Sequence, residues 1–245
     1  MGRIIKYDLK SNFKFFASTL IVYVIFMISI ASIRGIGAVN DVFKSEDTSK
    51  TLVIIEIIVF SFVVIYFLLN SFYKDLYTKR GVLTFTLPVN MSKYLFAKTI
   101  VIDLFYVLMI ALISISLKLS MGININRRLV IMFLMTLFII NLLANIAFFC
   151  MEVDKFYLSQ KNRNWVVVVA LVTFILIFTL AFLLCYKNVF YYDGMIKRGD
   201  NFLLAFIYPF EGKCINIVPF IYYFIVNVVL FALNVKILND DLDLS

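Results

Sequence analysis

The sequence contains no histidine, and it has little glycine, proline or charge. Of its 245 residues, 8 are Gly, 3 are Pro and 16% are charged, against about 25% charged in soluble domains. The absence of histidine removes the commonest general base and the commonest metal ligand. We therefore expect no catalytic residues and no metal site in this chain.

Two other functional signatures are also missing. The three cysteines (Cys150, Cys185 and Cys214) form no C-x-x-C pair, and their odd number gives no disulfide framework. We interpret them as small apolar residues. The sequence has no G-x-x-x-x-G-K-[ST] loop for nucleotide phosphates, so any ATP and Mg²⁺ would be bound by a separate polypeptide and no cofactor by this chain.

Apolar residues are in excess, at 63% of the chain against roughly 45–50% in soluble domains. About 20 apolar residues in a helix span a bilayer core of about 30 Å. Six runs reach this length, at about residues 15–33, 52–72, 99–117, 129–150, 165–186 and 217–235. The loops between them are too short for a second domain, which needs at least about 50 residues. The sequence predicts an all-α membrane protein, with residues 1–245 as a single transmembrane domain of six helices.

The net charge of +8 lies at the ends of the apolar runs. This distribution is typical of orientation signals and headgroup contacts, not of nucleic-acid binding. A slight majority of Lys and Arg predicts that both termini are cytoplasmic. Arg127 and Arg128 are exceptions to the rule that basic residues lie on the cytoplasmic side, because they fall on the outer side in this orientation. There they would meet outer headgroups or substrate.

The segment before the first run has basic residues at helical spacing on one face and apolar residues on another. It predicts an amphipathic helix over residues 2–14 at the inner membrane interface, with a plain basic flank as the alternative. All eight glycines fall outside the six runs. Ion-coupled transporters bind substrate where Gly or Pro interrupts a helix at the midplane, so we expect these helices to move as rigid bodies.

Few polar residues interrupt the runs. The charged residues within the six runs are Glu56 and Asp103. A carboxylate inside the membrane suggests a functional role. Snorkelling or pairing with a neighbouring helix is the alternative. Asn141 with Asn145 (fourth run), and Asn227 with Asn234 (sixth run), share helical faces, which favours hydrogen bonds between helices over pore lining.

Residues 73–98, between the second and third runs, have the features of a docking surface. A basic helix is followed by a break at Gly81, an apolar–polar alternation over residues 82–87 and a stop at Pro88. Asn90 or Ser92 then caps the next helix. An apolar strip with basic neighbours, too short to fold alone, is expected to bind a partner.

The motif F-T-L-P-V at residues 85–89, together with the opening residues 3–10, resembles the permease subunits of ABC type-2 exporters from low-GC Gram-positive bacteria. The likeness is greatest to the small permeases for peptide toxins or bacteriocin protection. It implies a location in the bacterial cell membrane, with two six-helix permeases, identical or paralogous, around a central path, each held by a cytoplasmic ATPase. It also implies a cytoplasmic coupling helix formed by Tyr77, Lys79, Arg80, Gly81, Leu83, Phe85, Leu87 and Pro88.

In that family the second and fifth spans border the path, which assigns Glu56, Tyr66, Phe174 and Phe178 to it. Residues 201–216 would form a re-entrant outer segment or an ordinary interfacial loop. The expected function is export of amphipathic or hydrophobic peptides, such as toxins or antimicrobial peptides, by alternating access. The alternatives are export of drugs or lipids, a passive channel and a membrane assembly subunit. An intramembrane enzyme using Glu56 or Asp103 is disfavoured, because no histidine or paired carboxylate accompanies them.

Overall fold

The computed structural model describes residues 2–39, 45–77, 91–121, 126–156, 164–187, 190–192, 196–199, 209–211 and 214–242. Its helices are α1 (Gly2–Val39), α2 (Ser45–Tyr77), α4 (Met91–Met121), α5 (Arg127–Phe156), α6 (Asn164–Lys187) and α7 (Val218–Leu242). The chain forms two compact units: unit 1 is Met1–Asn70 with Phe96–Val130, and unit 2 is Ser71–Leu95 with Ile131–Ser245.

Each predicted run lies within one of these helices, apart from Ile217, one residue before α7. Five helices are long and apolar enough to cross a membrane, over Ile4–Ser29, Val53–Tyr77, Met91–Lys118, Arg127–Val153 and Val218–Asn239. In α6 the described apolar part is shorter, Leu171–Tyr186. The helices extend beyond the runs because backbone hydrogen bonding continues through polar residues, whereas hydropathy stops there. The prediction of a predominantly helical protein is thus confirmed, and five of its described helices have the length and apolar composition that a membrane span requires.

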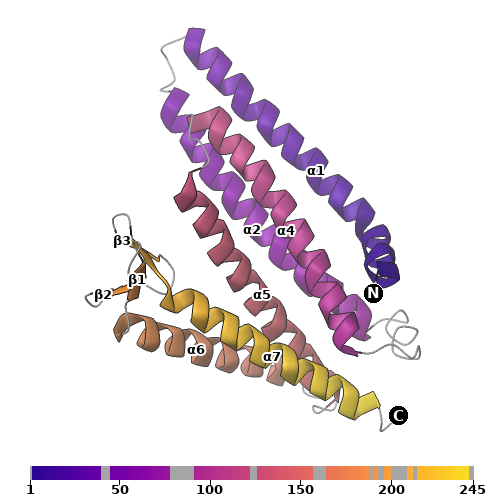
Figure 1. Cartoon of the computed structure of the whole chain (residues 1–245). Coiled ribbons are helices and arrows are strands. Elements are labelled where there is room, and N and C mark those ends of the chain that lie inside the picture. Colours follow the sequence, from indigo (N-terminus) through magenta and orange to yellow (C-terminus); the bar gives the residue numbers. More distant parts are fainter. Residues whose placement is uncertain are drawn as a thin grey trace. The chain divides into compact units, whose positions relative to one another are not determined.

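In unit 1, α1 and parts of α2 and α4 run side by side (Figure 1). Their core contains an aromatic cluster. The ring of Phe67 lies 4.6 Å from that of Phe105, and Phe15 and Phe16 pack on this pair at 5.5 Å from Phe67 and 5.0 Å from Phe105. Each aromatic pair contributes about 0.5–1.5 kcal/mol beyond its buried area. This cluster holds the early part of α1 against α2 and α4.

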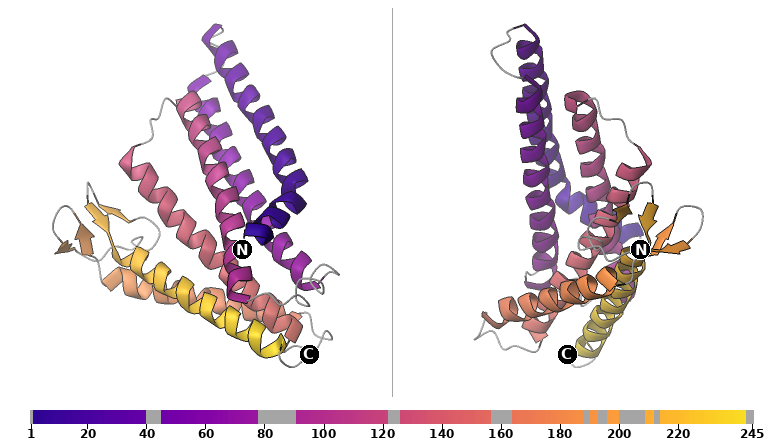
Figure 2. Two further views of the ribbon diagram at one scale, coloured as in Figure 1. Left: turned by 45° about the vertical axis from the view of Figure 1, so that its right-hand side comes forward. Right: turned by 90° about the vertical axis from the view of Figure 1, so that its left-hand side faces the viewer.

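The predicted amphipathic segment, residues 2–14, is the beginning of α1 and continues without interruption into the first apolar run. Figure 2 shows these first turns at an angle to the rest of the helix. Ser11 and Asn12 donate side-chain hydrogen bonds to the carbonyl oxygen of Asp8, at 2.9 and 3.0 Å. Such bonds compete with the helical ladder and bend helices. The polar residues Asp8 and Asn12 are buried here, whereas Phe13 is exposed.

Unit 2 has its own hydrophobic core, where α5, α6 and α7 meet. The members of this core are Met135, Leu142, Ile146, Cys150, Ile177, Ala181, Tyr223 and Leu230. Helices α6 and α7 lie side by side (Figure 1), and the Tyr222 hydroxyl donates to the carbonyl oxygen of Ile177 at 2.6 Å. At the start of α7, Asn216 Oδ1 accepts a hydrogen bond from the backbone N–H of Val218, which caps the helix.

Between α6 and α7 lies a small antiparallel sheet that the sequence analysis did not predict. Its strands are β1 (Phe190–Tyr192), β2 (Ile196–Arg198), β3 (Phe210–Glu211) and β4 (Cys214–Asn216), in the order β2-β1-β4-β3. Tyr191 pairs with Asn216, and Phe210 pairs with Ile215. In the predicted outer segment 201–216, the described residues other than Pro209 thus form β3 and β4, and residues 201–208 and 212–213 lie outside the described part.

Candidate functional site

Most of the predicted coupling residues lie outside the described part of the chain: Lys79, Arg80, Gly81, Leu83, Phe85, Leu87 and Pro88. Tyr77, the last residue of α2, is described. Its hydroxyl donates to the carbonyl oxygen of Met151 on α5 at 3.2 Å, and its ring stacks on that of Tyr73 at 5.1 Å. Tyr77 therefore joins the end of α2 to α5.

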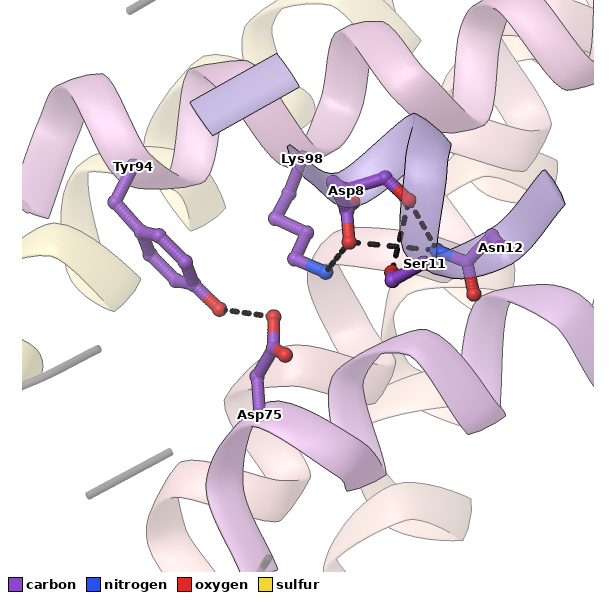
Figure 3. A network of polar contacts seen from close by, with 6 residues as sticks. All are labelled: Asp8, Ser11, Asn12, Asp75, Tyr94 and Lys98. Atoms are coloured by element: carbon purple, nitrogen blue, oxygen red, sulfur yellow. Dashed lines mark hydrogen bonds and ion pairs between the residues drawn. The ribbon is translucent and has the colours of Figure 1, made fainter. Parts of the chain in front are cut away.

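A buried hydrogen bond closes the base of the segment formed by residues 78–90. The Tyr94 hydroxyl, near the start of α4, donates to Asp75 Oδ2, near the end of α2, at 2.5 Å (Figure 3). Both side chains are buried. A few residues before Asp75, the ring of Phe72 packs on that of Phe148 of α5 at 4.7 Å. In unit 2, the helix ends that flank residues 78–90 are thus tied to each other, and the end of α2 is also tied to α5.

Unit 1 contains a buried ion pair that the sequence analysis did not single out. Lys98 Nζ on α4 lies 2.9 Å from Asp8 Oδ1 on α1, and Asn12 Nδ2 donates to the same oxygen at 3.3 Å (Figure 3). In the sequence, this pair is indicated only by Asp8, a single carboxylate within the basic segment of residues 2–14. A buried charge requires a partner, so this carboxylate marks a contact to a distant basic residue.

Glu56 is enclosed within unit 1, with only 1% of its surface exposed. Its Oε1 accepts a hydrogen bond from Ser116 of α4 at 2.7 Å, while Oε2 has no hydrogen-bond partner among the described residues. The Ser116 hydroxyl lies 3.0 Å from the Tyr23 hydroxyl of α1, which in turn donates to the carbonyl oxygen of Leu112. The Glu56 carboxyl thus links α1, α2 and α4. Asp103, the other carboxylate within the six predicted runs, is half-buried on α4.

The remaining residues assigned to the path are aromatic, and they belong to different units. Tyr66 is 59% exposed and borders a groove between α1 and α2 in unit 1. This groove has a volume of about 400 Å³ and is lined by Phe15, Ser18, Thr19, Val22, Val59, Phe60, Phe62, Val63 and Tyr66. In unit 2, Phe174 is 41% exposed and its ring lies 4.4 Å from that of Phe178.

Asparagines connect α5 and α7, which confirms the predicted hydrogen bonds between helices for Asn145, Asn227 and Asn234. Asn145 Nδ2 donates to Asn227 Oδ1 at 3.0 Å, and Asn227 Nδ2 donates to the carbonyl oxygen of Phe138 at 3.1 Å. About two turns further along α7, Asn234 Nδ2 donates to the carbonyl oxygen of Asn145 at 3.1 Å. These contacts lie inside unit 2 and hold α7 in register on α5.

Within the described ranges, no three His, Cys, Asp or Glu side chains are grouped to hold a metal ion. Comparison with known proteins found no matching family model, no matching curated protein and no matching solved structure. The functional argument therefore depends on the sequence patterns and on the contacts described above.

Proposed function

We propose that the protein is the membrane-spanning subunit of an ATP-driven ABC exporter, with residues 78–90 as the contact to a separate ATPase. The observation that carries this proposal is the buried bond between Tyr94 and Asp75, which closes the base of that segment. A segment tied at both ends to packed helices transmits a displacement to them, whereas a loose loop absorbs it. The residue pattern of the segment, apolar with basic neighbours, favours a protein partner.

In this proposal the chain supplies the path and the partner supplies the energy. ATP and Mg²⁺ are bound by two cytoplasmic ATPase subunits, because this sequence has no phosphate-binding loop. Two copies of the permease, or this chain with a paralogue, enclose the path, and each chain crosses the membrane six times with α6 included. The exposed aromatic side chain of Phe174, with the ring of Phe178 beside it, fits an amphipathic or hydrophobic peptide as cargo.

The proposal is tested by copurification. The protein is produced together with the products of the genes beside its own, purified through a tag on this chain, and assayed for a bound ATPase and for ATP hydrolysis. We expect the double variant Leu83→Asp/Leu87→Asp to lose the ATPase while remaining in the membrane, because two carboxylates would have to be buried at the contact. The matched control is Ile123→Asp/Ile125→Asp, in the loop expected on the opposite side. An intact complex with the first variant, or a wild-type chain that retains no ATPase, would overturn the proposal.

A variant of Tyr94 separates binding of the ATPase from the coupling of ATP hydrolysis to the peptide. Tyr94→Phe removes the bond to Asp75 but leaves residues 78–90 unchanged, so the variant is expected to retain the ATPase and to lose peptide stimulation of ATP hydrolysis. Tyr73→Phe is the control, because the Tyr73 side chain is exposed on the same part of α2. Equal stimulation in both variants would show that the Asp75–Tyr94 bond has no part in coupling.

A further inference from the structure

The groove between α1 and α2 offers a ligand almost nothing but hydrocarbon. Seven of its nine lining residues are Phe, Val or Tyr, and the other two are Ser18 and Thr19. Both hydroxyls already donate to the carbonyl oxygen of Phe15, at 2.8 and 2.9 Å. Along the groove there is thus no side-chain donor left for a ligand except the hydroxyl of Tyr66, at one end.

This chemistry selects a hydrocarbon chain over a peptide. A peptide would bring backbone N–H and C=O groups into an apolar surface, where each unsatisfied group is costly. An acyl chain has no such groups and fills the same space with methylenes. The groove lies on helices whose neighbouring side chains are also apolar and exposed, including Ile21, Ile25 and Ile65, so the surrounding bilayer is the direct source of such a chain.

Positive charge lies at the end of the groove where Tyr66 stands. Phe15 and Tyr66 are in ring contact at 5.9 Å, and Lys14 is adjacent to Phe15 in the chain. Lys14 and Lys10 precede Ser18 by one and two helical turns, so the three side chains share a face of α1. Both lysines are exposed, and neither has an acidic partner among the residues that the structure describes. Two exposed lysines on the turns of α1 that precede the apolar groove complement a phosphate joined to a hydrocarbon chain.

We propose that unit 1 binds an anionic glycerophospholipid of the surrounding membrane, with one acyl chain in the α1–α2 groove and its phosphate at Lys14 and Lys10. The acyl chain packs against Phe60, whose ring contacts that of Tyr23 at 5.5 Å, beside the hydrogen bonds of Glu56. The lipid thereby supports the packing of α1 on α2. This inference does not depend on the exporter proposal, since the site is formed by unit 1 alone.

The test uses fluorescence quenching by brominated lipids. Trp165 is the only tryptophan in the sequence, so the variant Trp165→Phe/Phe62→Trp carries a single indole in the groove. In vesicles of phosphatidylcholine with increasing brominated phosphatidylglycerol, we expect quenching that saturates at a low mole fraction. Brominated phosphatidylcholine should quench only in proportion to its amount. Proportional quenching by both lipids would identify ordinary surrounding lipid and overturn the proposal.

Two sets of variants, each with a control, locate the site. Lys14→Ala and Lys10→Ala should each lower the preference for phosphatidylglycerol about fivefold, whereas Lys93→Ala, on the exposed surface of α4, should not. Ser18→Leu fills the groove and should abolish saturable quenching. Ser29→Leu should not, although Ser29 also is exposed and bonds a carbonyl of its own helix, that of Ile25 at 2.9 Å. The same response in Ser18→Leu and Ser29→Leu would overturn the proposed position.

A second measurement needs no reporter. Native mass spectrometry of the unmodified chain, released from mixed vesicles, is expected to show one retained phosphatidylglycerol that is lost in the Lys10→Ala/Lys14→Ala variant. A variable number of lipids of both classes, unchanged by the two substitutions, would contradict the proposal. Displacement of the retained lipid by a hydrophobic peptide at an equal concentration would assign the groove to peptide and would likewise overturn it.

Discussion

Lys98 Nζ lies 2.9 Å from Asp8 Oδ1, and their side chains are only 2% and 3% exposed. The two residues are 90 positions apart, so this pair brings the beginning of α1 onto α4 within unit 1. Asn12 donates a further hydrogen bond to the same carboxylate oxygen. Removal of one charge from such a pair leaves the other buried without compensation, which is much more costly than removal of both.

Breaking this ion pair should lower the stability of the protein. We expect Lys98→Met to cost about 3–5 kcal/mol, and the double variant Asp8→Asn/Lys98→Met to regain a large part of that loss. The measurement is thermal unfolding of the purified protein in detergent, followed by circular dichroism. Lys93→Met, an exposed lysine on the same helix, is the control. A melting temperature of Lys98→Met equal to that of the control would contradict a stabilising ion pair.

The hydrogen bond from Ser116 to Glu56 should contribute more than an ordinary serine contact. Ser116→Ala removes the described donor to Glu56 Oε1 inside unit 1, at a cost of about 1–3 kcal/mol. Ser61→Ala is the matched control, because Ser61 is exposed on α2 and bonds only the carbonyl of Ile57. It should change stability by less than about 0.5 kcal/mol. Equal unfolding temperatures for the two variants would show that the Glu56 cluster is not stabilising.

The variant Glu56→Gln distinguishes a role of this carboxylate in stability from a role in transport. The amide oxygen of glutamine accepts the Ser116 hydrogen bond, so the unfolding temperature should change little. If the carboxylate also borders the proposed path, this variant should lower peptide-stimulated ATP hydrolysis of the reconstituted complex. Unchanged stimulation would leave Glu56 with the packing role that its burial describes.

Asn145 and Asn227 should show a measurable coupling energy. Replacing either with Leu leaves the other amide with an unpaired group between α5 and α7, whereas replacing both removes the mismatch. A double-mutant cycle in detergent is expected to give about 0.6 kcal/mol and at most about 1.7 kcal/mol, the range found for hydrogen bonds between membrane helices. Strictly additive effects of the two substitutions would show that the contact does not form in the folded protein.

The positions of the two termini test whether α6 crosses the membrane. The 24 residues of α6 extend about 36 Å, enough for a bilayer core of about 30 Å. With six crossings the termini lie on one side, so green fluorescent protein fused after Ser245 should be fluorescent and alkaline phosphatase fused there should be inactive. With five crossings the phosphatase would be active, while a tag at the N-terminus would remain cytoplasmic. That result would remove α6 from the membrane and contradict the six-span prediction.

The helices were predicted from the sequence because membrane spanning is a local property of about 20 consecutive side chains. Runs such as residues 52–72 carry that signal without any knowledge of their neighbours, and α2 contains the whole run. The four-stranded sheet carried no such signal. Its strands are two or three residues long, and its central pairing joins Tyr191 to Asn216, so it depends on contacts distant in the sequence.

The candidate site was predictable only in part, for a related reason. The spacing of Asn227 and Asn234 indicated a polar face on one helix, but not which groups they would meet on α5. Asp8 was overlooked because a single carboxylate in a basic segment has no periodic signal. Its importance arises from Lys98, and only folding brings the two together.

The sequence by itself determined where the chain is apolar for long enough to span a bilayer, and it placed the glycines and most charges at the ends of those runs. This was possible because hydropathy and chain length act locally. Only the tertiary structure decided that Glu56 is enclosed by α1 and α4, that Tyr94 ties the base of residues 78–90, and that α1 and α2 leave an apolar groove between them. These features depend on which helix faces meet, and a polar side chain acquires its role only from the partner that packing gives it.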